Sequence, residues 1–304
     1  MVDPIKGGKV INWDAMERVW GYTFNELHVN SSQCNVHLTE MPFSPNIDRE
    51  KKAEIMFEKF DVQNMYISLD AALSLFSIGK NTGLVVDSGY EVTNITPIFQ
   101  GYGIKHTMQT LNIGGNTISK YLESLLMDNG ASGSINSDTV NSIKEKLAYV
   151  SYDFNTHMAN STPSSFTLLD DTNVVLDKEL FNAPEVLFQP EFFDMETDPL
   201  HKKIFKAINS SDIDIRYDLY NSIHLFGGNS LIPGLPERIK KELSVLTSSV
   251  TNIKVNTLPH DQAKFSSWIG GSKYCQILTD QKLWIPKEDY DEHGPYIAKI
   301  RLNH

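Results

Sequence analysis

Asp87, Ser88 and Gly89 are the residues whose types and order best suit binding chemistry. They follow the apolar residues 84–86, and a second apolar run covers residues 92–98, so two strands around a tight turn are predicted. Successive backbone N–H groups in such a turn can bind an anion, and a glycine lets the backbone approach closely. The aspartate could hold a hydrated metal ion beside that anion. An ordinary hairpin, in which the aspartate bonds its own turn, is the alternative.

Two further glycine pairs have the same kind of setting. One lies in the stretch 227–230, which is followed by Ile232, Pro233 and Gly234, and the other lies in residues 268–271. Glycines let a backbone pass close beneath a flat ligand such as a purine. A Gly-Gly pair that only serves a turn is the simpler interpretation of each.

Alternating helices and short strands must position these residues. A first helix is expected to begin near residue 13. Further helices are expected over residues 50–60, 65–76, 116–126, 138–152, 199–209, 212–221 and 235–243, and a closing helix after residue 271. Short strands are expected near residues 38–39, 84–86, 92–98, 106–111, 224–226 and 253–255. Residues 129–138 are predicted to form a polar loop, and residues 153–187 give no clear pattern. This alternation indicates an α/β fold.

Composition excludes several classes of protein. The 304 residues include 27 Lys plus Arg against 38 Asp plus Glu, a net charge of −11, and show no large basic block. Direct nucleic-acid binding is therefore not expected. Cys34 and Cys275 give no disulfide framework, and the sequence shows neither a signal peptide nor an apolar run of membrane-spanning length. We expect a cytoplasmic or nuclear protein without membrane insertion, with about two domains.

The sequence resembles the actin family. The similar stretches are VINWDAMERVW, LTEMPFSPNIDREKKAEIMFEKF, TGLVVDSGYEVTNITPIFQGYGI, IKEKLAYVSYDF, EVLFQPEFF, DIDIRYDLY, LFGGNSLIPGLPERIKKEL, FSSWIGGS and WIPKEDYDEHGP. They occur in the family's order from about Pro4 to Gly294. The resemblance implies an actin-like ATPase (ribonuclease H-like) fold, with two related α/β halves around a nucleotide cleft. The implied halves are residues 1–77 with 266–304, which are incomplete, and residues 78–113 with 196–265, into which 114–195 insert as a subdomain.

The resemblance also implies how ATP or ADP would bind with Mg²⁺ or Ca²⁺. Asp87 matches the carboxylate that holds the metal through water, Ser88 and Gly89 match the phosphate hairpin, and Gly115 matches a glycine on the nucleotide side of the cleft. The residues implied around the adenosine and the α-phosphate are Lys144, Glu145, Gly227, Gly228, Asn229 and Lys264. A carboxylate such as Glu145 can accept from ribose hydroxyls. Without the resemblance, the pair 144–145 would read as a solvated helix face.

Several positions depart from the family pattern. Tyr90 and Glu91 stand where actins have Asp and Gly, and Ile232 replaces a tyrosine near the adenine. A carboxylate about 4 Å from a phosphate costs roughly 4 kcal/mol at an effective dielectric constant of about 20. The candidate catalytic positions also differ, because Asp70 replaces a glutamine that orients water and Asn94 replaces a nearby histidine. A weak or lost nucleotide site with little or no hydrolysis is therefore expected.

The part of an actin that carries the first phosphate hairpin is absent from the printed sequence. Removing the first strands of a sheet leaves an unpaired edge and an uncovered apolar face. Either a partner covers them, or the sequence belongs to a longer protein.

Three functions stay open. The first is an actin-like cytoskeletal protein with a degenerate ATP site, which assembles with actin-family subunits or actin-binding proteins. The second is an actin-related subunit of a chromatin remodeller or a dynactin-type complex, in which other subunits cover the incomplete half. The third is a fragment of a longer, ATP-hydrolysing actin.

Overall fold

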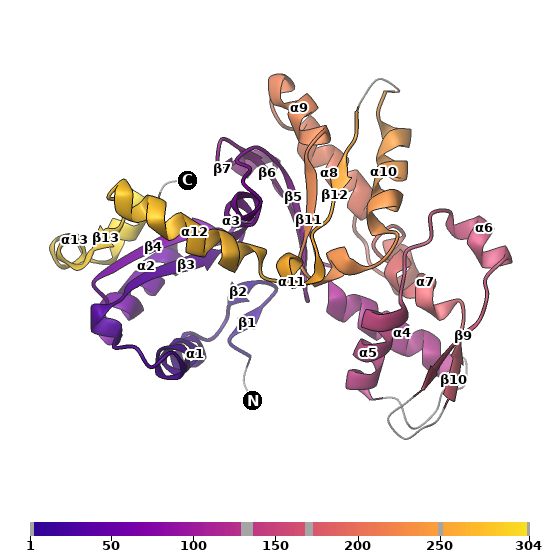
Figure 1. Ribbon diagram of the computed structural model, residues 1–304, viewed down its shortest axis with the longest axis horizontal. Coiled ribbons are helices and arrows are strands. Elements are labelled where there is room, and N and C mark those ends of the chain that lie inside the picture. The colour runs from indigo at the N-terminus through magenta and orange to yellow at the C-terminus, as the bar shows by residue number, and fades with distance from the viewer. Residues whose placement is uncertain (1–2, 129–135, 168–172, 249–251, 303–304) are drawn as a thin grey trace. The chain divides into compact units, whose positions relative to one another are not determined.

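The chain forms two compact units in the computed structural model, which describes residues 3–128, 136–167, 173–248 and 252–302 (Figure 1). Unit 1 contains Met1–Asn81, Ile98–Lys105 and Phe265–His304, and unit 2 contains Thr82–Pro97 and His106–Lys264.

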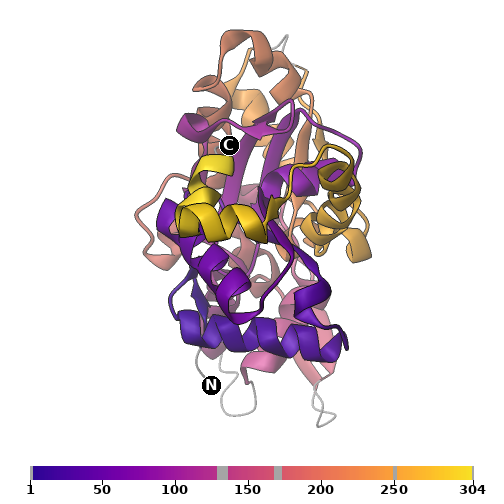
Figure 2. The ribbon, with the colours of Figure 1, turned by 90° about the vertical axis from the view of Figure 1, so that its left-hand side faces the viewer.

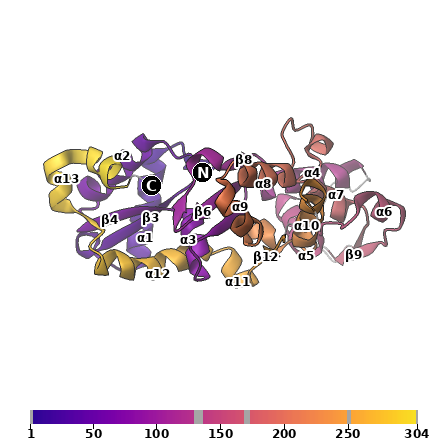
Figure 3. The same ribbon diagram turned by 90° about the horizontal axis from the view of Figure 1, so that it is seen from above.

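Unit 1 is built on a sheet of order β13-β4-β3, in which β3 runs parallel and β13 antiparallel to β4. Its strands are β3 (Asn35–Glu40), β4 (Asn64–Leu69) and β13 (Ile285–Pro286), and its main helices are α2 (Asn46–Glu54), α3 (Asp70–Ser77), α12 (Ser266–Asp280), α13 (Lys287–His293) and α14 (Ile297–Arg301). Helices α12 and α2 lie on opposite sides of β3 and β4 (Figure 3). The sheet therefore has a helix on each face, as its buried central strand requires.

The helix predicted over residues 65–76 is wrong in its first half, because residues 65–69 belong to strand β4. Met65, Tyr66 and Ile67 are all buried, and β4 lies between β3 and β13. A strand that is covered on both faces gives a continuous apolar run, which periodicity alone does not distinguish from a buried helix. The second half is helical as predicted, in α3.

The first helix is confirmed as α1 (Trp13–Glu26), in which Asn12 Oδ1 accepts from the Ala15 N–H at 2.9 Å. It follows the short strands β1 (Ile5–Lys6) and β2 (Lys9–Val10). In Figure 2 it is the indigo helix that runs horizontally near the bottom of the view. A π-helical turn over Ile55–Lys59 continues α2. Strand β7 (Tyr102–Gly103) pairs with Ile98 and Phe99, the last residues of β6 (Thr93–Phe99).

Unit 2 contains the hairpin predicted around residue 88. Its strands are β5 (Gly83–Ser88), β6 (Thr93–Phe99), β8 (Gln109–Leu111), β11 (Ile223–Phe226) and β12 (Val255–Asn256), in the order β12-β11-β5-β6 with β8 on β6. The turn covers residues 89–92 and is closed by the Gly89 N–H, which donates to Val92 O at 3.0 Å. It is longer than the tight Ser-Gly turn predicted. Parallel pairing of β5 and β11 places Asp87 opposite Phe226, so both strands end at one edge.

Helices α8, α9 and α10 lie beside the strands of unit 2 (Figure 1). The helices are α4 (Gly115–Asp128), α5 (Ser137–Leu147), α6 (Phe154–Ala159), α7 (Glu179–Glu185), α8 (Leu200–Asn209), α9 (Ile213–Tyr220), α10 (Leu235–Leu246) and α11 (His260–Ala263), with a hairpin of β9 (Ser164–Thr167) and β10 (Asn173–Leu176). The helix predicted to 152 ends at Leu147 because Ala148 has an extended backbone, with ψ 143°. Helices α6 and α7 were not predicted, and most of the predicted loop 129–138 lies outside the described residues.

The turn predicted at residues 268–271 is wrong, because these residues lie inside α12. A Cβ on Gly270 would lie 1.9 Å from Leu73 O of α3. This glycine therefore permits two helices to pack closely. Among the described residues, no helix is long and apolar enough to cross a membrane.

Candidate functional site

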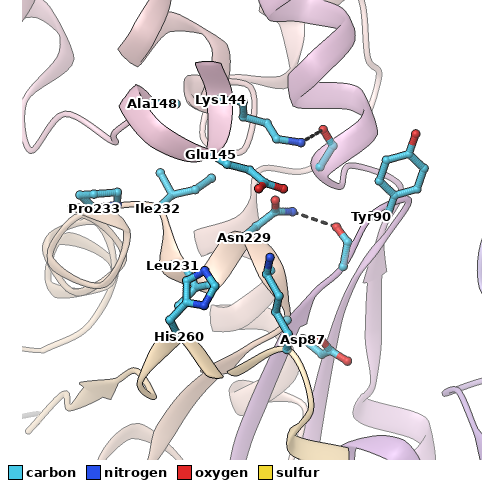
Figure 4. Close-up of a pocket in the computed structure, with 15 residues that line it drawn as sticks. Asp87, Tyr90, Lys144, Glu145, Ala148, Asn229, Leu231, Ile232, Pro233 and His260 are labelled. Atoms are coloured by element: carbon cyan, nitrogen blue, oxygen red, sulfur yellow. Dashed lines mark hydrogen bonds between the residues drawn. The ribbon is translucent and has the colours of Figure 1, made fainter. Parts of the chain in front are cut away.

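A cavity of about 440 Å³ opens in unit 2 where β5 and β11 end (Figure 4). Its volume is in the range of small-molecule sites. The lining residues are Asp87, Gly89, Tyr90, Gly115, Lys144, Glu145, Ala148, Gly227, Gly228, Asn229, Leu231, Ile232, Pro233, His260 and Lys264.

Most of the predicted nucleotide-binding residues line this cavity together. Ser88 does not, and neither does the candidate catalytic residue Asn94; Asp70, the other candidate, belongs to unit 1. The lining residues that the sequence did not reveal are Ala148, Leu231 and His260. Ala148 follows Lys144 by four residues, directly after α5. His260 precedes Lys264 by the same spacing, at α11 and the residue after it, so helical periodicity could have found both.

A chain of hydrogen bonds joins the hairpin to the turn after β11. The Asn229 Nδ2 amide donates to Gly89 O at 2.9 Å and to Ser88 Oγ at 3.0 Å. Thr93 Oγ1 donates to Ile113 O at 2.8 Å, so at the 2.7 Å contact the Ser88 hydroxyl donates to Thr93. Ser88 is buried, and its hydroxyl stabilises the hairpin.

The start of α4 is bonded to the same hairpin. The Gly115 N–H donates to Gly89 O at 2.9 Å, and the Asn116 N–H donates to Tyr90 O at 2.7 Å. A Cβ on Gly114 would lie 2.6 Å from Tyr90 O, so only glycine permits this approach. Gly114 is therefore required by the close packing of α4 against the hairpin, and Gly115 lines the cavity.

Lys144 brings a buried ammonium to the cavity. Its Nζ donates to Gly115 O at 3.0 Å, Ser119 Oγ at 2.8 Å and Asn141 Oδ1 at 3.4 Å, all of them neutral acceptors. Burial lowers the pKa of Lys144, and the neighbouring Glu145 carboxylate opposes that effect. A polar or anionic ligand would favour the charged form in the same way.

Asp87 lies at the end of β5, and burial raises the pKa of its carboxyl group to about 6. Gly227 follows β11 with φ +80°, and a Cβ there would lie 2.5 Å from Asp87 Oδ1. In the described part of the chain, no group of three or more His, Cys, Asp or Glu side chains could hold a metal ion. A metal at Asp87 would therefore be held by one carboxylate, water and ligand oxygens, as is common for Mg²⁺.

The two candidate catalytic residues have local partners. Asn94 is buried in β6, and its Oδ1 accepts from Thr110 Oγ1 on β8 at 2.8 Å. Asp70 is in unit 1 at the start of α3, where its Oδ1 accepts from the Ala71 N–H at 2.6 Å. A carboxylate at a helix N-terminus is stabilised by the helix dipole.

Comparison with models of protein families gives a match to the model described as Actin. The match covers residues 1–136 and 132–303, which together include nearly all of the chain.

Proposed function

Because the chain belongs to the actin family, we propose that it is an actin-like structural protein whose unit 2 binds an adenine nucleotide and hydrolyses it little or not at all. The resemblance seen in the sequence is confirmed, and the α/β architecture fits the actin-like ATPase fold. The observation that carries the proposal is the cavity at the ends of β5 and β11. Open α/β sheets bind ligands outside the carboxyl ends of their strands.

The lining residues fit the adenosine part of a nucleotide. Ala148, Ile232 and Pro233 give an apolar wall for a flat base, and the Glu145 carboxylate can accept from ribose hydroxyls. A Cβ on Gly228 would meet only Lys264 Cε, at 3.8 Å, so the backbone leaves open space there. Asp87 would hold a divalent ion through water. A nucleotide that binds only the folded protein stabilises the folded state by mass action.

Weak hydrolysis is supported by the positions that depart from the family. The Asn94 amide is bonded to Thr110, and Asp70 bonds its own helix start. The Asn94 side chain, which is in unit 2, does not line the cavity.

Calorimetry with ATP and ADP, with and without Mg²⁺, tests binding. Loss of one hydrogen bond to a charged group costs about 1.5–3 kcal/mol, so we expect Glu145→Gln to weaken both nucleotides roughly tenfold or more. The matched control is Glu237→Gln at an exposed position of α10, which should bind like the natural protein. Absence of nucleotide binding would refute the binding part, and sustained phosphate release from ATP would refute the hydrolysis part.

The second function, a subunit of a chromatin-remodelling or dynactin-type complex, is favoured by the surface of α1. Across α1, which is described in full, no residue is buried, and Val19 and Tyr22 are 44% and 64% exposed. Exposed apolar side chains that lie together mark interaction surfaces, and Val19 and Tyr22 are three residues apart on one helix. Co-sedimentation of the purified protein with actin filaments would support the cytoskeletal function. Its recovery in a defined nuclear or dynactin-type complex, without co-sedimentation, would support the second.

A further inference from the structure

We propose that His260 is the residue of unit 2 that recognises the base, by stacking its imidazole ring on a purine in the cavity. This inference rests on the proposed nucleotide site and adds to it a residue that selects among ligands. The ligand class is then a purine nucleotide in preference to a pyrimidine nucleotide.

The first argument is the place of His260 in the cavity. Figure 4 shows its ring beside Leu231 and apart from Ile232 and Pro233. All four residues line the cavity, and Ile232 and Pro233 belong to its apolar wall. A flat base that lies against this wall with one face meets the imidazole ring with the other.

The second argument is that the backbone at His260 is fixed while its ring is free. His260 begins α11, where the N–H groups of Gln262 and Ala263 both donate to Pro259 O at 3.0 Å. The Gly227 N–H donates to Ala263 O at 3.1 Å, which ties α11 to the end of β11 beside the cavity. His260 is exposed, and within the described part of the chain its ring makes no hydrogen bond or ion pair. A ring that is held in place in this way can bind a ligand without giving up a protein contact.

The third argument is that the wall itself distinguishes poorly between bases. The Ile232 N–H already donates to Asn229 O at 3.1 Å, and Pro233 has no N–H. The Pro233 carbonyl already accepts from the Val150 N–H at 2.7 Å. Because an apolar surface alone discriminates weakly between similar ligands, selection of the base falls to a side chain, and His260 is the one placed for it.

The fourth argument is the size of the base. Stacking on an aromatic ring does not depend on the polar groups of a base, because every base has a flat face. A purine has two fused rings and a pyrimidine has one, so a purine removes more apolar area from water between the imidazole and Ile232. Stacking on His260 therefore favours purines without requiring a particular group on the edge of the base.

Titration of the full chain with ATP and with CTP, each with Mg²⁺ at constant ionic strength, tests this inference. Loss of an aromatic stack weakens binding by about five- to 150-fold. We therefore expect His260→Ala to weaken ATP at least about fivefold and CTP less, so that the preference for ATP falls. His260→Phe keeps a flat ring and should bind ATP within about threefold of the natural protein. The matched control is His106→Ala, at an exposed residue of unit 2 that does not line the cavity, and it should leave both dissociation constants unchanged.

The outcomes separate the inference from the proposed function. Unchanged ATP affinity in His260→Ala would overturn the inference and leave the proposed function intact. Equal losses for ATP and CTP would also overturn it, because His260 would then support the shape of the cavity rather than the base. A loss in His260→Phe as large as that in His260→Ala would contradict stacking. If the natural protein bound neither nucleotide, the proposed function would fail, and the inference with it.

Discussion

Replacement of Gly270 by alanine is expected to destabilise unit 1, whereas the same change at Gly271 is not. Both glycines lie inside α12, which packs on α3. A Cβ on Gly270 would lie 1.9 Å from Leu73 O and 2.6 Å from Leu73 C, which are backbone atoms. A Cβ on Gly271 would lie 3.4 Å from Leu73 Cδ1, an ordinary contact with a flexible side chain.

The magnitudes follow from these distances. Alanine favours a helix interior over glycine by about 1 kcal/mol, and this gain is common to both variants. Gly271→Ala should therefore stabilise unit 1 by roughly 0.5–1 kcal/mol. At Gly270 the two helices must separate by about 1.5 Å to relieve the overlap, and overpacking of this kind costs about 1–3 kcal/mol or more. Because the gain is common to both, the variants should differ by the overpacking cost alone, about 1–3 kcal/mol or more.

Urea unfolding followed by far-UV circular dichroism and tryptophan fluorescence measures this difference. Because two compact units can unfold separately, the transition of unit 1 must be identified first. The adjacent positions share a helix, a residue type and a substitution, so only the contact with Leu73 distinguishes them. Equal midpoints and slopes for the two variants would refute the close approach of α12 to α3.

Two further changes test the buried polar groups. Glu185→Gln should cost roughly 1.5–3 kcal/mol of unfolding free energy, because the buried Arg238 loses its bidentate carboxylate and keeps only Glu242 as an ion-pair partner. The control Lys241→Met, on the same helix α10, removes exposed contacts, an ion pair with Asp153 and a hydrogen bond to Tyr152 O, and should change the urea midpoint far less; equal losses would contradict this reasoning. Burial lowers the pKa of His37, whose ring nitrogen Nε2 lies 2.7 Å from Ser68 Oγ. Since the unfolded chain then binds more protons, stability should be constant well above pH 6.5 and fall as the pH drops through and below that value. Urea midpoints at pH 8, 7, 6 and 5 for the natural protein and for His37→Gln measure this loss of stability. Identical dependence of the midpoints on pH in the two proteins would argue against a contribution of His37.

The sequence allowed much of the candidate site to be predicted, because short local patterns carry it. Apolar runs followed by Asp87 and by Gly227 indicated two strand ends, and parallel pairing brings these ends to one edge. Lys144 and Glu145 could not be assigned from local pattern, since a charged pair on a helix is usually solvated. Only the resemblance to a family assigned them to the candidate site.

Some partners of the site residues have a tertiary origin that the sequence does not show. Ser88 was assigned to the phosphate hairpin, and in the structure its hydroxyl bonds Thr93 and accepts from Asn229, which is 141 residues away in the chain. No pattern near Ser88 indicates that distant partner. The same holds for Asn94, whose amide oxygen accepts from a hydroxyl on a neighbouring strand.

The glycines show most clearly where prediction from sequence ends. Gly114, Gly227 and Gly270 each belong to a Gly-Gly pair, and the pairs at 227 and 270 were first interpreted as turns. In the structure a Cβ would meet backbone within 2.6 Å at all three positions, although one precedes a helix, one follows a strand with a positive φ, and one lies inside a helix. What they share is a close approach of backbone segments that are distant in the sequence. A glycine pair therefore predicts that two segments meet closely, but which segments meet, and whether a ligand lies between them, depends on the rest of the fold.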